Sequence, residues 1–379
     1  MGIDAYSEEG RTEVSNTVLL SHTFTFQAPK AHMIDWVTAI IPFVHEPLNS
    51  GSVLKVLPSG EVDWESPCRL QVEGSHEQGI TVKSQGGDGS GLATELVIHG
   101  NPAKFLQGHN IFGSDDLLSL VLDTFLTVAS KLNLPLTQET IDLVREGDYP
   151  LARVDINGMF ELRTLADVKN WLRAAEFKSK TRHGRPSSKG GTLYWGKHSR
   201  RWSIKAYSKG EEIQASKSHK LAPQFKDTPL YDFAQNKLRI ELTLRSKELE
   251  KIGLKTARSW QKETSMRLLN TYIKRIEMSE QIALSTKVLH ELPTYLRSTY
   301  VLWKDGHNPR EMLSKPTFYK HRAHLLQHGI DINITVEKVD RSNVVPLVRV
   351  LEAKPVQIPD WAFELGLVHH SAEKLTNVG

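Results

Sequence analysis

The sequence has only one cysteine, Cys68, so it cannot form an internal disulfide or a cysteine-based zinc cluster. It also has no run of about 18 apolar residues, the length that a membrane helix needs, and no basic-then-apolar order typical of a secretory signal. The 379 residues are 39% hydrophobic and 24% charged, which is typical of a globular chain, and they show no internal repeat. We therefore expect a cytoplasmic protein with two or three domains, each of about 100–200 residues.

Acidic residues are missing from one long segment. Between Phe177 and Gly210 there are ten Lys or Arg residues and no Asp or Glu, although the net charge of the whole chain is only +4. Such a segment is either a solvated basic loop or a surface that binds nucleic-acid phosphates. The second interpretation makes Tyr194 and Trp195 stacking faces for a melted strand, and its candidate DNA-binding residues are Lys178, Lys180, Arg182, Arg185, Lys197, Arg200, Arg201 and Lys205.

Strands and helices alternate without regular βαβ repetition, which predicts an α+β fold. Short strands separated by glycine-rich turns are expected from residue 33 to about 100, followed by a helix with Ser114 as its N-cap. From about residue 255 the pattern is mainly helical. The predicted domains are a polar N-terminal extension (1–32), a catalytic domain (33–254), a helical DNA-binding region (255–361) and a tail (362–379).

Three predicted strands share an alternation of apolar and polar residues. In the segment WSIKAYSK the polar side holds Ser203, Lys205, Tyr207 and Lys209, and the apolar side holds Trp202, Ile204 and Ala206. The segments LARVDING and LRIELTLR alternate in the same way. If the three strands lie in one sheet, their polar side chains form one chemical face that contains Asp155, Tyr207, Lys209 and Glu241.

These residue types suit phosphate transfer. Carboxylates such as Asp155 and Glu241 are ligands for Mg²⁺ or Mn²⁺, with Glu211 or Glu212 as a candidate third ligand. A tyrosine beside lysines is a candidate nucleophile, because cations favour its phenolate. The alternatives are a surface salt bridge for the aspartate and a buried hydrogen-bonding anchor for the tyrosine. His99 and His109 are either metal ligands or structural histidines.

Three helical segments between residues 293 and 329 have the lengths of a helix-turn-helix DNA reader. In that interpretation Lys320 and Arg322 of the third helix contact phosphates or guanines. The alternative is a purely structural three-helix core.

The sequence resembles the gene II-type replication initiators of filamentous phages (inoviruses). The resemblance runs in order from residue 33 to 361 and rests on the segments MIDWVTAIIPF, NPAKFLQGHNIFG, RVDI, AYSKGEEIQ, LRIELTLRSKELEKIGL and NVVPLVRV followed by PDW. It implies an initiator-like antiparallel sheet with packed helices, and an endonuclease that nicks the double-stranded replicative form at the plus-strand origin. The enzyme would remain on the 5′ end through tyrosine, leave a 3′-hydroxyl for polymerase, and later recircularise the displaced single strand.

By this resemblance Tyr207 is the nucleophile and Lys209 and Glu212 belong to its motif, while the acidic metal ligands are Asp155 and Glu241. Mg²⁺ (or Mn²⁺) is the implied cofactor, and Gln107, His109 and Asn110 lie in a further family motif of unassigned role. The implied partners are the replicative-form and single-stranded DNA and the host helicase, polymerase and single-strand-binding protein, in the host cytoplasm. Whether several copies assemble at the origin stays open.

The sequence departs from many rolling-circle initiators in one respect: it has no His-hydrophobe-His metal motif, since His99 and His109 lie ten residues apart. Two other functions also fit parts of the pattern. One is a non-catalytic DNA-binding regulator, and the other is a metal-dependent nuclease in which water attacks the phosphate.

Overall fold

The computed structural model describes ten segments of the chain: residues 32–48, 51–74, 78–87, 89–215, 221–261, 263–278, 286–305, 307–328, 330–333 and 354–369. Several sequence predictions concern residues outside them. These are the N-terminal extension apart from His32, the NVVPLVRV segment at 343–350, and the last ten residues of the tail.

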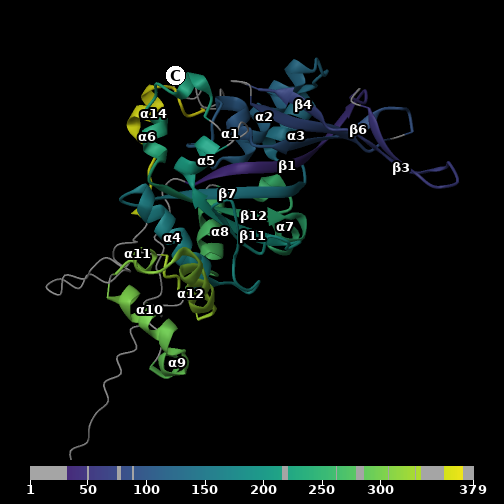
Figure 1. Cartoon of the computed structure of the whole chain (residues 1–379). Coiled ribbons are helices and arrows are strands. Elements are labelled where there is room, and N and C mark those ends of the chain that lie inside the picture. Colours follow the sequence, from purple (N-terminus) through teal and green to yellow (C-terminus); the bar gives the residue numbers. More distant parts are fainter. Residues whose placement is uncertain are drawn as a thin grey trace, which may run out of the picture.

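A large antiparallel sheet forms the centre of the molecule (Figure 1). In the described residues it has ten strands, each antiparallel to its neighbours, and this confirms a mixed fold built on an antiparallel sheet. The order along the sheet is β4 (Leu70–Glu73), β5 (Gly79–Gln85), β6 (Ala93–Gly100), β1 (His32–His45), β7 (Leu151–Glu161), β12 (Lys237–Arg245), β11 (Trp202–Ser208), β10 (Thr192–Trp195) and β9 (Ser187–Lys189), with β14 (Lys354–Pro355) also paired to β7.

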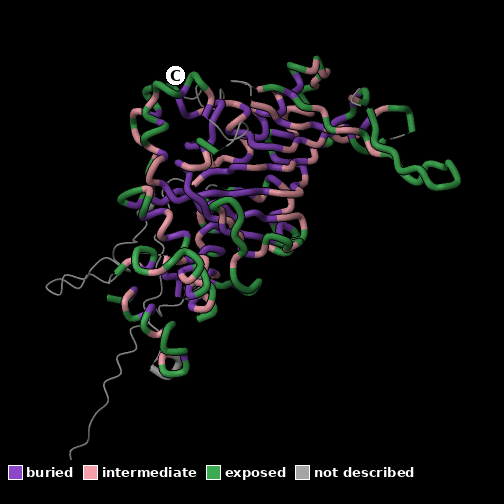
Figure 2. The backbone as a smooth tube through the Cα atoms, viewed as in Figure 1, coloured by how far each residue is buried: buried purple, intermediate pink, exposed green. Residues whose placement is uncertain are grey.

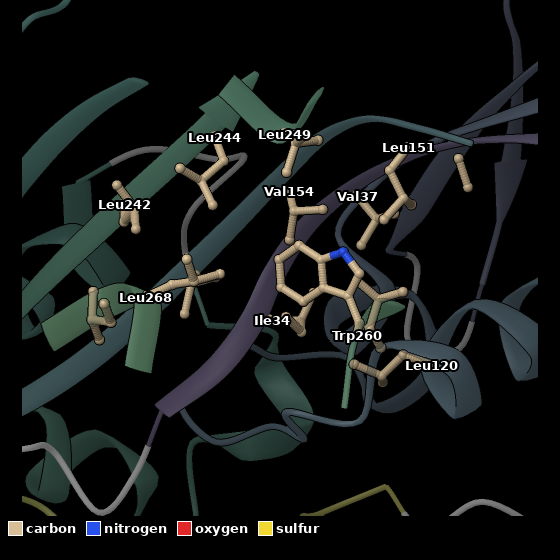
Figure 3. Packing of buried hydrophobic residues seen from close by; sticks show 14 of the residues in the cluster. Ile34, Val37, Leu120, Leu151, Val154, Leu242, Leu244, Leu249, Trp260 and Leu268 are labelled. Atoms are coloured by element: carbon tan, nitrogen blue, oxygen red, sulfur yellow. The ribbon is translucent and has the colours of Figure 1, made fainter. Parts of the chain in front are cut away.

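Helices cover the apolar face of this sheet. Strand residues such as Ile34, Val154 and Leu244 pack against Leu249 and Trp260 in the main core (Figure 3). Each is almost fully buried, so truncation of one such leucine to alanine costs about 2–5 kcal/mol. The covering elements are α2 (Leu117–Lys131), α3 (Gln138–Glu146), α4 (Leu165–Lys178), α7 (Ser246–Lys251), η3 (Ala257–Ser259) and α8 (Thr264–Ile273).

The polar face is covered at one end by a second, smaller core. Met159 of β7 lies on this face and packs with Ile111, Phe112, Ile213 and Leu230. This second core covers the end of the polar face at which Met159 lies. The short elements that contribute to it are α5 (Lys209–Ala215), η2 (Pro223–Phe225), α6 (Leu230–Ala234) and α14 (Asp360–Glu364), whereas α1 (Pro102–Gln107) packs on the main core through Phe105.

The helices predicted after residue 293 form at the expected positions and have a hydrophobic cluster of their own around Tyr300, Trp303 and Phe318. The elements here are α9 (Thr286–Glu291), α10 (Thr294–Lys304), α11 (Pro309–Met312) and α12 (Lys315–Gln327), while β13 (Glu277–Met278) pairs with β8 (Ser179–Lys180). Three helices that share a hydrophobic cluster are expected both of a purely structural core and of a helix-turn-helix DNA reader. The helix-turn-helix therefore stays a prediction.

Two further features concern local structure. The hairpin of β2 (Ser52–Val56) and β3 (Val62–Pro67) extends from the sheet as an exposed arm (Figures 1 and 2). The N-cap of α2 is Asp116 and not the predicted Ser114: the Asp116 side chain accepts a hydrogen bond from the Ser119 backbone N–H, while Ser114 caps the preceding turn.

In the described part of the chain, no helix has the length and apolar character to cross a membrane.

Candidate active site

Tyr207 and Glu241 meet on the polar face of the sheet, on the neighbouring strands β11 and β12. Lys205 lies directly opposite Glu241 in the register of these strands, and Tyr207 lies opposite Arg239. The Tyr207 hydroxyl donates a hydrogen bond to Glu241 Oε1, and Lys205 Nζ lies 2.6 Å from Glu241 Oε2. One buried carboxylate therefore joins the phenol to an ammonium group that is 33% exposed.

Burial decides the protonation of this pair. It raises the pKa of Glu241 above its ordinary value, and the nearby charge of Asp35 raises it further against the opposing effect of Lys205. Burial and the Glu241 charge also hold the pKa of Tyr207 well above its ordinary value. The expectation that neighbouring lysines favour the phenolate is wrong for this arrangement, because the nearest charged group to the hydroxyl is a carboxylate.

Lys209 does not share the strand face with Tyr207, contrary to the predicted alternation. Strand β11 ends at Ser208 and Lys209 begins α5, which turns its side chain into the protein. Its fully buried ammonium lies 2.8 Å from Asn110 Oδ1 and 2.6 Å from Glu212 Oε2. Burial, with the charge of Arg239, lowers the pKa of Lys209 to about 8.

Asp35 is a site residue that the sequence reasoning missed. It occupies a bulge between Ile34 and Trp36 in β1, and a bulge can direct an extra side chain to one face of a sheet. Its Oδ1 accepts hydrogen bonds from the side-chain amides of Asn101 (2.9 Å) and Asn110 (2.8 Å). Burial raises its pKa, but the charges of Arg239, Lys205 and Lys209 and the hydrogen bond from Asn110 outweigh burial, so the pKa lies below its ordinary value. The only sequence signal was an acid that interrupts an apolar strand.

Arg239 and the segment 101–113 hold this network in place. The completely buried guanidinium of Arg239 donates through Nη2 to the backbone oxygens of Asn110 (2.5 Å) and Ile111 (3.0 Å). Gln107 donates to the backbone oxygen of Phe112 at 2.8 Å, and His109 packs edge-on against Phe225. Of the three family-motif residues, only Asn110 therefore presents its side chain to the site.

Asp155 lies on the same face, one strand further along the sheet. Asp155 pairs with Thr243, and Glu241 pairs with Asn157, so the two acids are diagonal neighbours on β7 and β12. Arg153 holds Asp155 through two hydrogen bonds of 2.8 and 2.5 Å, while burial raises the pKa of Asp155 despite this partner.

The two carboxylates fit Mg²⁺ by their chemistry. Among the described residues no three His, Cys, Asp or Glu side chains are arranged so that they could bind a metal ion by themselves. Mg²⁺, however, is commonly held by one or two carboxylates together with substrate phosphates and water. The basic partners Arg153 and Lys205 are 36% and 33% exposed, whereas the acids are 3% and 1% exposed, so the cations are accessible to a phosphate from solvent.

The basic segment, residues 177–210, lines a groove beside Tyr207. The groove has a volume of about 230 Å³ and is lined by Tyr194, Lys205, Tyr207 and Glu212 together with the Gly190–Gly191 turn. Lys180, Arg182, Arg185, Lys197, Arg200 and Arg201 are exposed, while the side chain of Lys178 lies outside the described part. Arg182 lies over the ring of Trp202, and Lys197 over that of Tyr194.

Trp195 is not a stacking face. It is fully buried, and its indole N–H donates to Ser179 at 3.0 Å. The alternation of β10 explains this, because residues 193 and 195 point to the main core while Tyr194 points to the groove. In the C-terminal helices Lys320 is exposed, but Arg322 is held by Asp331 through hydrogen bonds of 2.7 and 2.9 Å.

Comparisons with known proteins identify the family of this chain. The family described as replication-associated protein G2P matches through its N-terminal part at residues 33–263 and its C-terminal part at residues 284–368. The chain belongs to the G2P family. The replication-associated protein G2P of Enterobacteria phage I2-2 is 52% identical over 328 residues, which cover 86% of this chain and 95% of that protein.

The membership in the G2P family confirms the predicted resemblance to gene II-type proteins, and with it a role in phage DNA replication. Among solved structures, a rolling-circle replication initiator protein from Geobacillus stearothermophilus is 10% identical with a TM-score of 0.30. That comparison covers 68% of this chain and 89% of the other.

Proposed function

We propose that this protein is a DNA endonuclease and strand transferase that nicks the phage's double-stranded replicative form at the plus-strand origin, with Tyr207 as the nucleophile. The observation that carries the proposal is the hydrogen bond from the Tyr207 hydroxyl to buried Glu241, with the groove of the basic segment beside it. A phenol whose proton already points to a base of raised pKa is prepared for attack on phosphorus.

The step proposed is a transesterification. Glu241 accepts the phenolic proton as the bond between Tyr207 Oη and phosphorus forms. The phosphorus–O3′ bond breaks, and O3′ takes up a proton from water to become the 3′-hydroxyl from which polymerase extends. The 5′ end stays joined to Tyr207, and the reverse reaction would later close the displaced strand without ATP.

The other groups have supporting roles in this proposal. Lys205 is placed to move from Glu241 to the phosphate, since it lines the groove. Asp155 and Glu241 would hold Mg²⁺ or Mn²⁺, which would supply positive charge to the phosphate oxygens as negative charge develops there. Lys209 is better suited to position the site than to react, because its ammonium ties α5 to Asn110 and pairs with Glu212 of the same helix. The partners remain those that the family resemblance implies.

The proposal is tested by replacing Tyr207 with phenylalanine, which removes one oxygen from a folded strand. Wild-type protein is incubated with Mg²⁺ and supercoiled replicative-form DNA of its own phage, labelled at the 5′ end of the nick, and analysed on a denaturing gel. We expect label that travels with the wild-type protein and none with Tyr207→Phe, while DNA binding survives.

Two other outcomes would replace the proposal. Nicked DNA without protein-bound label would identify a hydrolytic nuclease, since water would then be the nucleophile. Binding without nicking in any divalent metal would identify a non-catalytic regulator.

A further inference from the structure

Two arginines face each other on the polar side of the sheet, at the end of β12 opposite to Arg239. Arg153 of β7 and Arg245 of β12 are directly paired in the strand register, where like charges are unfavourable. Arg153 has an acidic partner in Asp155, whereas Arg245 donates to the neutral hydroxyl of Ser203 at 3.2 Å. Partial burial and the charge of Arg153 together lower the pKa of Arg245. The fold therefore maintains an unfavourable cationic pair at this position.

An aromatic side chain lies beside the pair. The guanidinium of Arg153 lies over the ring of half-buried Trp36, 5.4 Å from its centroid, and His99 contacts the same ring edge-on. The Trp36 indole N–H has no hydrogen-bond partner within the described segments. Burial, with the charges of Arg69 and Arg153, lowers the pKa of His99 to about 4, so the imidazole is neutral at physiological pH. Positive charge here thus comes from arginine alone.

We propose that Arg153 and Arg245, with Trp36 beside them, form a binding site for the phosphate backbone of single-stranded DNA. A phosphate between the guanidiniums would remove their repulsion and accept hydrogen bonds from both. Trp36 would offer its ring or its indole N–H to the adjoining nucleotide, which favours an unpaired strand over a duplex.

The position of this site relative to Tyr207 indicates how it would orient the DNA. Arg245 lies four residues beyond Glu241 on β12, or about 13 Å along the strand, on the same face. A strand bound there would continue across the sheet to Tyr207, and so the site would orient the DNA on one side of the nick. This orienting role rests on the proposed function. Binding of single-stranded DNA to the site can be measured in a protein that does not cleave DNA.

The test measures binding of a fluorescent oligothymidine by anisotropy over a series of NaCl concentrations. The full chain carries Tyr207→Phe throughout, so that no cleavage occurs. Each phosphate contact on single-stranded DNA contributes about 0.7 to the slope of log affinity against log salt. We expect Arg245→Gln to weaken binding and reduce that slope by about 0.7, and Arg245→Lys to retain most of it. The matched control is Arg145→Gln, on α3 across the sheet, which should leave the slope unchanged.

Thermal stability separates a binding role from a structural one. Removal of one charge from a repelling pair should leave the melting temperature of Arg245→Gln equal to or above that of its parent. An unchanged salt slope would overturn the proposal, whether or not the melting temperature falls.

The outcome is independent of the Tyr207 experiment. If Arg245→Gln lowers the salt slope while the protein with Tyr207 intact forms no covalent adduct with DNA, this site is supported and the transesterification by Tyr207 is refuted. Covalent adducts with an unchanged slope would do the reverse.

Discussion

Replacement of Glu241 by glutamine tests the centre of the proposed mechanism with almost no change of shape. Glutamine keeps an oxygen that can accept the Tyr207 hydrogen bond but cannot take the proton. General-base catalysis contributes about 10²–10⁴-fold to a rate. We therefore expect Glu241→Gln to lower the rate of covalent adduct formation by at least about 100-fold at neutral pH.

The same substitution should leave the fold intact. The raised pKa of Glu241 means that its ionised form is disfavoured in the folded state, so stability falls as the pH rises past the ordinary pKa and the full cost is present above the folded pKa. Glutamine removes that cost. It also removes the pairing with Lys205, which is 33% exposed and contributes about 0–1 kcal/mol. The free energy of unfolding should thus stay within about 1 kcal/mol of the wild-type value.

The pH profile distinguishes a base from a structural partner. The wild-type rate should rise with pH as Glu241 ionises, because only the carboxylate accepts the proton, and Glu241→Gln should lose this rise. The comparison variant, Lys205→Gln, leaves the carboxylate without its cation and should move the rise to higher pH. The assay is adduct formation on the labelled nick substrate, with stability followed by urea denaturation. A Glu241→Gln rate within twofold of wild type would refute the reasoning.

Two further predictions concern the metal ligands and the groove. Asp155→Asn should slow nicking in Mg²⁺ and recover part of the rate in Mn²⁺, because a neutral amide binds Mg²⁺, the harder ion, less well than it binds Mn²⁺. Full wild-type activity in the presence of a chelator would contradict the metal assignment. Trp195→Ala should destabilise the fold by about 3–5 kcal/mol in urea denaturation, because Trp195 fills the main core. Tyr194→Ala should instead weaken binding of single-stranded DNA and leave stability nearly unchanged, and equal stability losses for the two variants would contradict the assignment of their faces.

The sequence predicted the elements and much of the chemical face. Alternation in WSIKAYS, LARVDING and LRIELTLR identified β11, β7 and β12, and it placed Tyr207, Glu241 and Asp155 on one side. This succeeds because a strand has a period of two residues, so one buried face determines the direction of every side chain. The ordered family motifs likewise indicated the G2P family before the fold was known.

Only the tertiary structure decided which of these groups touch. Asp35 joins the site through a bulge, and bulges depend on how strands register with their neighbours. Lys209 leaves the face because the strand ends one residue earlier, where α5 packs against the second core. The direction of the Tyr207 pKa depended on burial beside Glu241, which no local pattern contains. Local alternation fixes the face of a side chain, but its partners and its protonation depend on residues far away in the sequence.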